Sequence, residues 1–337
     1  MPADAPISDG GRINRERMRF VPMNVAAASK KKKRGLLESV ALELRRRGRL
    51  YLMLVIPVAY IILFCYVPMS GVLIAFEDYS LRKGVWGSPW VGLKHFREFF
   101  TTPVFKQLML NTLSLSIYGF VAGFPAPIIL ALALNECKRP RFKKTVQMVT
   151  YAPYFISTVV MVSIIIQFLH VRTGMVNNFI KLMGFEPYDF MGNPDAFRSI
   201  YVWSGVWQGV GYSAVIYLAA LAGIDLSLQE AAIIDGANRF QRVYHVDLPS
   251  ILPTIVIQMI LSLGSLLSVG YEKVYLMQNS LNMSQSEIIS TYVYKRGLQD
   301  IQYSYSTAVG LFNSVVNLIL ICSANAIARR VNDTSLW

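Results

Sequence analysis

The sequence predicts an all-α membrane protein, a polytopic bundle of six transmembrane helices with both termini in the cytoplasm. Two features of composition favour this class: 54% of the 337 residues are hydrophobic and only 16% are charged, whereas about a quarter of an average soluble domain is charged. The third feature is a series of apolar runs of about 20 residues, the length that crosses a hydrocarbon layer of roughly 30 Å.

Six apolar segments are predicted to span the membrane. Each contains Gly, Pro or polar residues, which neighbouring helices compensate in a bundle. The first begins too far along the chain, and is too long, to be the apolar core of a secretory signal, so we expect it to remain in the mature protein. The expected spans are residues 52–76, 105–134, 146–169, 200–222, 252–277 and 307–328.

Basic residues predict the orientation, because Lys and Arg are retained on the cytoplasmic side. With the N-terminus inside, the four inner segments hold 22 of the 33 Lys and Arg residues. Both termini are therefore expected in the cytoplasm. The inner segments are 1–49, 136–144, 223–250 and 329–337.

The chain is predicted to divide into a basic cytoplasmic tail (1–49), a six-helix domain (50–329) and a short C-terminal tail (330–337). Residues 36–49 allow an amphipathic helix on the membrane surface. The net charge of +13 is concentrated just before the first span, where it serves as a topology signal and attracts anionic membrane lipid. No nucleic-acid partner is expected from it.

The inner loop between the fourth and fifth spans (223–250) is the most informative segment. Ser227 followed three residues later by Glu230 matches a capping box, so a short helix is predicted to begin there. Gly236 can adopt the left-handed conformation that ends a helix, and Pro249 is predicted at the entry to the fifth span. The expected product is a rigid helical knob; the alternative is an ordinary loop with a well-capped helix.

Capping alone does not explain the whole pattern of this loop. Glu-Ala-Ala is followed after three residues by Gly, after nine more by an aliphatic residue, and after one more by Leu-Pro. The pattern resembles the cytoplasmic signature of permease subunits in binding-protein-dependent ABC importers, with Val246 in place of the family's usual Ile. The matching residues are Glu230, Ala231, Ala232, Gly236, Val246, Leu248 and Pro249.

The resemblance extends to the carbohydrate branch of these importers through Asp235, Gly236 and Ala237. Three further stretches, 291–298, 303–311 and 335–337, resemble permeases for complex oligosaccharides, including uronate oligomers. The similarity covers roughly residues 50–337. It implies that the loop docks on an ATP-hydrolysing subunit and that a periplasmic or extracellular solute-binding protein delivers a saccharide. It also favours a homologous, rather than identical, second permease.

The chain is not expected to be an enzyme or to bind a cofactor. It contains no Gly-rich phosphate-binding loop that ends in Gly-Lys-Ser/Thr, so ATP and Mg²⁺ are expected in two separate ATP-binding cassette subunits. No metal site is expected either, because the candidate ligands are isolated from one another: Cys65, Cys137, Cys322, His95, His170 and His245.

A substrate pathway is expected on the polar and aromatic faces of the spans, since sugars present hydroxyl edges and C–H faces. Each such residue has an alternative role in holding helices together. Glu272 differs, because a carboxylate near the membrane is costly; for a uronate cargo it would pair with Lys273 or lie at the outer rim. The candidates are Tyr151, Trp203, Trp207, Gln208, Glu272, Asn313 and Asn317.

An ion-coupled secondary transporter or a channel subunit is the alternative function. That class would require charged residues at mid-membrane for ion coupling, and the predicted spans are nearly free of them. A membrane-embedded enzyme would require clustered His, Asp or Glu residues, which the spans also lack.

Overall fold

The computed structural model describes residues 36–332, and their side chains over 47–330. Within this range every regular element is helical, and the only β-pairing is an isolated bridge between Glu77 and Trp90. The all-α prediction is therefore confirmed. The chain forms two compact units, one that ends at Val67 and one that begins at Pro68.

The first unit contains helix α1 (Leu36–Ile61) and a π-helical turn (Ile62–Tyr66). The backbone of α1 departs from helical geometry at Arg47, with φ −122° and ψ 20°. A helix is thus present over 36–49, and its place on the membrane surface stays a prediction. The predicted domain boundary at residue 50 lies inside α1 and also stays a prediction, while residues 1–35 lie outside the described range.

Five helical segments of the described chain are long and apolar enough to cross a membrane, and a bent pair would make a sixth. This matches the six predicted spans if the bent pair is one span. The five are Arg47–Phe76, Phe105–Asn135, Pro194–Ala222, Arg239–Gly264 and Tyr303–Arg330; the pair is Pro140–Phe155 with Thr158–Leu169.

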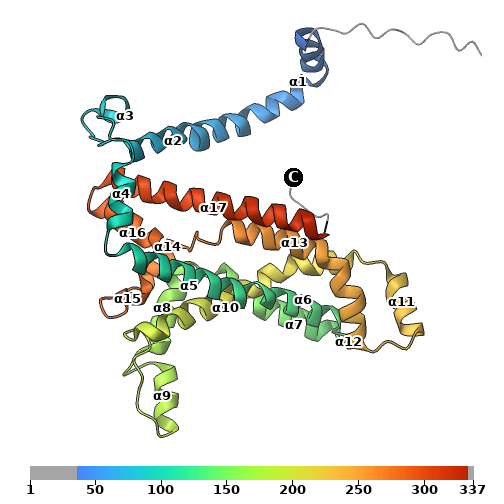
Figure 1. The fold of residues 1–337 in the computed structure, drawn as a ribbon. Helices are drawn as coiled ribbons and strands as arrows, with labels where there is room; N and C mark the ends of the chain where they lie inside the picture. Colours follow the sequence, from blue (N-terminus) through green and yellow to red (C-terminus); the bar gives the residue numbers. More distant parts are fainter. Residues whose placement is uncertain (1–35, 333–337) are drawn as a thin grey trace, which may run out of the picture. The chain divides into compact units, whose positions relative to one another are not determined.

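The second unit is built around the long helix α10 (Pro194–Ala222), which packs against α5, α6, α7 and α13 (Figure 1). Short 3-10 or π turns connect several of its helices. The bounds are α2 Val67–Met69, α3 Gly84–Gly87, α4 Lys94–Thr101, α5 Phe105–Gly123, α6 Pro125–Asn135, α7 Pro140–Tyr151, α8 Thr158–Leu169, α9 Met175–Leu182, α11 Leu226–Ile234, α12 Arg239–Arg242, α13 Leu248–Gly264, α14 Tyr271–Met277, α15 Met283–Ser286, α16 Ile289–Tyr294 and α17 Tyr303–Asn332.

The third predicted span, 146–169, is not one straight helix. α7 and α8 are bent by 103° at a 3-10 turn, Ala152–Phe155. Pro153 in this turn lacks a backbone N–H, and Ser157 then begins a new helix by accepting a hydrogen bond from the Val160 N–H at 3.4 Å.

The fifth predicted span, 252–277, is wrong at both ends. The helical segment begins at Arg239, passes through a π turn (Val243–Asp247) and stops at Gly264, after which α14 is a separate helix. Pro249 lies in the first turn of α13, as predicted for a helix start, but α13 itself continues a helical segment that begins at Arg239, ten residues before Pro249. The change of hydrogen-bond register in the π turn accommodates a residue that has no N–H to donate.

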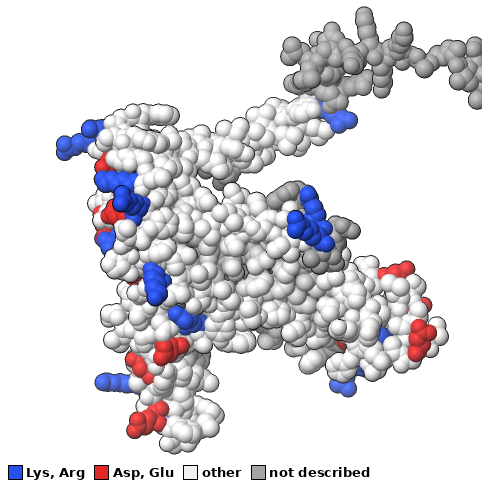
Figure 2. Space-filling view, viewed as in Figure 1, with Lys and Arg blue, Asp and Glu red and all other residues white. Residues whose placement is uncertain are grey.

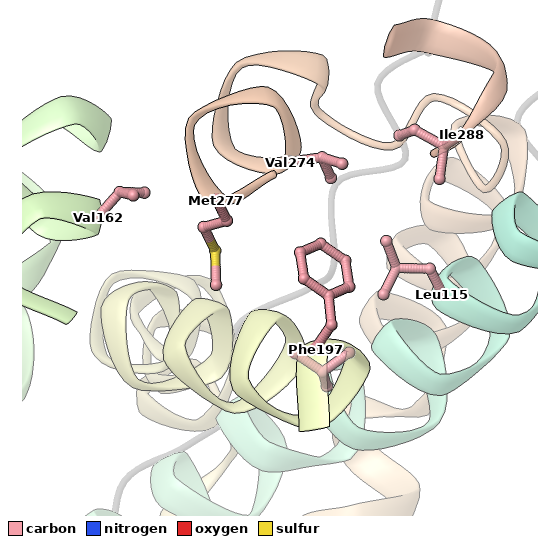
Figure 3. Close-up of a cluster of buried hydrophobic side chains, with 7 residues drawn as sticks. Leu115, Val162, Phe197, Val274, Met277 and Ile288 are labelled. Carbon is pink, nitrogen blue, oxygen red and sulfur yellow. The ribbon is translucent and has the colours of Figure 1, made fainter. Parts of the chain in front are cut away.

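The main hydrophobic cluster joins α10 to α14 and α5. In Figure 3, Phe197 of α10 lies between Met277 and Val274 of α14 and Leu115 of α5. Close packing of these side chains holds α14 in place even though it is only seven residues long. The buried members are Leu115, Val162, Phe197, Val202, Val274, Met277 and Ile288.

Gly211 is needed where α10 crosses α7, because a Cβ atom at this position would lie 2.1 Å from the carbonyl oxygen of Thr150. We expect Gly211→Ala to lower the free energy of unfolding by about 1–3 kcal/mol through overpacking. Gly209 on the same helix has no neighbour within 4 Å of such a Cβ, so Gly209→Ala is the matched control. Thermal unfolding of the purified chain in detergent measures both, and equal losses in the two variants would contradict this account.

Candidate functional site

The first part of the site is the segment 223–250, which contains helix α11. Asp225, and not Ser227, is the N-cap residue: its Oδ1 accepts a hydrogen bond from the Ser227 N–H at 2.9 Å. The predicted capping box of Ser227 and Glu230 is therefore wrong, because an equally good capping residue lies two positions earlier. The same hydrogen bond lowers the pKa of the Asp225 carboxyl below its usual value.

The end of α11 is as predicted. Gly236 has φ +77°, and its N–H donates to the Ile233 carbonyl at 3.1 Å while the Ala237 N–H donates to the Ala232 carbonyl at 2.9 Å. This is the Schellman arrangement, in which a left-handed residue closes the helix.

A second short helix, α12, follows at once and was not predicted. Asn238 and Gln241 begin it with a capping box, in which each side chain accepts from the other residue's backbone N–H at 2.8–2.9 Å. The spacing of an Asn three residues before a Gln is the signal that could have identified it.

Helix α11 has no buried residue, and in Figure 1 it stands at the edge of its unit. Ile234 at its end is 85% exposed, and Glu230 and Asp235 are exposed beside it. Figure 2 shows acidic side chains gathered over this part of the molecule. The helix therefore presents an exposed apolar tip among carboxylates.

A buried polar network ties α11 to the neighbouring helices. The carboxylate of Asp247, which is fully buried, accepts hydrogen bonds from Gln229 of α11 and from Asn135 at the end of α6. Beside it, the Arg242 guanidinium lies 3.0 Å from the Glu136 carboxylate, and both side chains are largely buried. These contacts join α11 to the end of α6 and to the start of α13.

The residues of the predicted permease pattern lie around this network, but the pattern does not include Asp247 itself. Leu248 packs against the cluster formed by α6, α10 and α13, and Pro249 is exposed. Both lie at the root of the loop, whereas Glu230, Ala231 and Ala232 lie on α11. An Asp between apolar residues at the start of a span is the signal that could have pointed to Asp247.

The second part of the site is a pair of adjoining cavities, here called the polar cavities, among α5, α6, α10, α13 and α14. Their volumes are about 320 and 290 Å³, and Gly119, Gly123, Pro127 and Ser213 line both. The first is also lined by Gln258 and Ser262, and the second by Gly205, Gln208, Gly209 and Lys273.

Of the candidate pathway residues, Gln208 lines a polar cavity, where its Nε2 also donates to the Ile156 carbonyl at 3.0 Å. Trp203 and Trp207 are more than half exposed. Neither of them lines a polar cavity, and neither does Tyr151, which ends α7.

The other candidates lie elsewhere. Asn317 stabilises the helix break after α13, because its Oδ1 accepts a hydrogen bond from the Leu267 N–H at 3.1 Å and its Nδ2 donates one to Ser268. Asn313 lines a separate cavity of about 490 Å³ beside α16 and α17. Glu272 is exposed, and within the described chain no ion pair joins it to Lys273. The pairing named as one possibility is not formed.

Sequence reasoning missed Lys273 and the glycine-lined wall of the polar cavities. Gly119 and Gly123 on α5, and Gly205 and Gly209 on α10, recur at the four-residue spacing that places them on one helix face. This spacing is visible in the sequence, but the prediction relied on the tryptophans of α10, Trp203 and Trp207, which lie on a different face of the helix.

The family model described as "Binding-protein-dependent transport system inner membrane component" matches residues 123–333. Protein LplB of Bacillus subtilis (strain 168) is 46% identical over 87% of this chain and 92% of its own length. The polygalacturonan/rhamnogalacturonan transport system permease protein YteP of the same organism is 43% identical over 93% of this chain and 96% of its own.

One solved structure with the same architecture is a chain of a bacterial ABC transporter involved in the import of the acidic polysaccharide alginate. It superposes with a TM-score of 0.82 at 36% identity and covers 87% of this chain and 99% of that chain. A second structure, of the bacterial alginate ABC transporter in complex with a periplasmic protein that holds an alginate pentasaccharide, superposes with a TM-score of 0.81 at the same identity over 87% and 98% of the two chains.

Proposed function

The chain belongs to the family of binding-protein-dependent transport system inner membrane components, and from this membership we infer that it is a multi-pass permease subunit of an ATP-driven saccharide importer. It would form half of the translocation pathway for an oligosaccharide or polysaccharide fragment in the bacterial cytoplasmic membrane. The names of YteP and of the alginate transporter support a saccharide cargo.

The observation that carries the proposal is the geometry of α11. A nine-residue helix without a buried residue, closed at both ends by its own caps and rooted in a buried polar network, is built to be held by another protein. A helix that packs into a groove moves as a unit with whatever grips it.

The partners follow from this arrangement. With both termini in the cytoplasm, α11 would dock on one of two ATP-binding cassette subunits, which bind ATP and Mg²⁺; the chain itself would bind no cofactor. Glu230, Ala231, Ala232, Asp235, Gly236 and Ala237 would form the contact, and Leu248 and Pro249 its root. A second, homologous permease would complete the pathway, and a solute-binding protein would deliver the saccharide.

The network beneath α11 supplies the mechanical link. When the ATPase subunits close, α11 moves, and Asp247 and the Arg242–Glu136 pair pass the displacement to α13 and α6. These two helices line the polar cavities through Gln258 and Pro127. Movement at the cytoplasmic knob would therefore reshape the cavities, with Gln208 as the candidate pathway residue that already faces them. An ion-coupled transporter would have no use for the knob.

Gly236 provides a direct test of the coupling knob. Its φ of +77° is strained for a β-branched residue, whereas Asn tolerates it. No atom lies within 4 Å of a Cβ built there, so a substitution tests the backbone conformation and not a side-chain clash. We expect Gly236→Val to cost the helix end about 1–2 kcal/mol and to reduce both saccharide uptake and copurification of the ATPase, while Gly236→Asn preserves both. Full uptake in Gly236→Val cells, at wild-type abundance in the membrane, would contradict the proposed coupling.

A further inference from the structure

Lys273 is the one charged residue that lines either of the polar cavities. Its Nζ donates to the Tyr201 carbonyl at 2.8 Å and lies 4.6 Å from the centroid of the Tyr201 ring. An ammonium group has three donors, so the carbonyl leaves two of them for other partners. The π face of a tyrosine attracts a cation but does not neutralise its charge.

No carboxylate within the described chain forms an ion pair with Lys273. The adjacent Glu272 is exposed, and the residues that line the polar cavities include no acid. A cation that is partly removed from water without a counter-charge is costly. This cost is offset when an anion enters the cavity.

The wall beside Lys273 is formed in part by glycine. A Cβ atom at Gly205 would lie only 3.2 Å from Nζ, so the ammonium packs directly against this glycine. Gly209, one turn further along α10, has no neighbour within 4 Å of a Cβ, so it leaves room for an anion. The cation is held at its place by the packing of α14, because Val274 and Met277, three residues apart on one face of the same helix, are buried in the main hydrophobic cluster. Lys273 is therefore a fixed positive charge at the edge of a cavity that also contains the Gln208 amide and the Ser213 hydroxyl.

We propose that Lys273 binds the carboxylate of the transported saccharide, and that the cargo of this importer is an acidic oligosaccharide. This rests on the saccharide importer function proposed above and adds its substrate class. Gln208 and Ser213, on the same cavity wall, supply an amide and a hydroxyl for the sugar's own hydroxyl groups. The Lys273 ammonium is already oriented before the carboxylate binds, so less conformational entropy is lost on binding.

The experiment compares two probes of the same size, trigalacturonate and its fully methyl-esterified form, in cells that express the complete importer. Initial uptake rates are measured for the wild type, Lys273→Gln and Lys273→Arg. Because a hydrogen bond to a charged partner is worth about 1.5–3 kcal/mol, we expect Lys273→Gln to reduce uptake of the acid by roughly ten- to a hundredfold. Uptake of the ester should change little, and Lys273→Arg should retain most of the uptake of the acid.

Each other outcome overturns a defined part of the proposal. Equal losses for both probes in Lys273→Gln would mean that Lys273 only fixes α14 to α10. Unchanged uptake of the acid in this variant would mean that the cation does not contact the cargo. If the wild type takes up the ester faster than the acid, the acidic substrate class is wrong, while the function as a saccharide importer is still supported. If the wild type takes up neither probe, both the proposed saccharide cargo and the assignment of Lys273 are wrong.

Discussion

Ile234→Asp is expected to reduce saccharide uptake to background while the chain still inserts and folds. Ile234 is 85% exposed at the end of α11, so the substitution removes no contact within the chain. In the docked state, the new carboxylate would enter an apolar contact without a partner, which costs about 3–5 kcal/mol. That loss corresponds to an affinity for the ATPase subunit that is lower by roughly two to four orders of magnitude.

The measurements are uptake in cells, copurification of the ATPase with the tagged chain, and thermal unfolding of the chain alone. Ile234→Leu is the matched control, because it keeps the apolar volume at the same place. Copurification at the wild-type level in Ile234→Asp, with normal uptake, would exclude α11 as the coupling element.

The sequence was sufficient for the elements whose cause is local. Apolar length predicts where each of the five long helical segments and the bent pair lie, although not all of their bounds. The end of α11 follows from the tolerance of Gly236 for a left-handed backbone. The start of α11 was wrong because Asp225 and Ser227 are both good caps, and sequence alone does not decide between two caps two residues apart.

The breaks within the spans could not be predicted from apolar length. The stop at Gly264 is stabilised by Asn317, 50 residues further along the chain from Leu267, and the bend at Ile156 is stabilised by Gln208. Both polar residues are also candidates for the substrate pathway. Their contacts agree with the alternative role, that of holding helices together, because a freed backbone group in a membrane must find a partner within the protein.

The face of α10 that lines the polar cavities could not be predicted from the sequence, for a different reason. Trp203 and Trp207 define one helical stripe, and Gly205 and Gly209 define another. In a soluble protein the larger apolar residues would mark the inside, but lipid is as apolar as the protein interior, so this asymmetry is lost. The structure places the glycine stripe on the polar cavities and leaves the tryptophans more than half exposed.

Gly209→Leu is therefore expected to abolish uptake without weakening the fold. A Cβ at this position meets no atom within 4 Å, and the added side chain extends into a cavity of about 290 Å³. Leu in place of Gly also raises helix propensity by roughly 0.5–1 kcal/mol, so the thermal midpoint should stay level or rise. The loss of uptake would then come from the filled cavity.

Two controls separate a blocked pathway from a disturbed helix. Gly209→Ala gives α10 the same gain in propensity but adds only one carbon atom, so it should retain most of the uptake. ATP hydrolysis by the assembled importer should continue in Gly209→Leu, because α11 and its network are untouched. If Gly209→Leu transports at the wild-type rate, the cavity between α10 and Lys273 lies off the pathway, and the route must be sought along the separate cavity lined by Asn313.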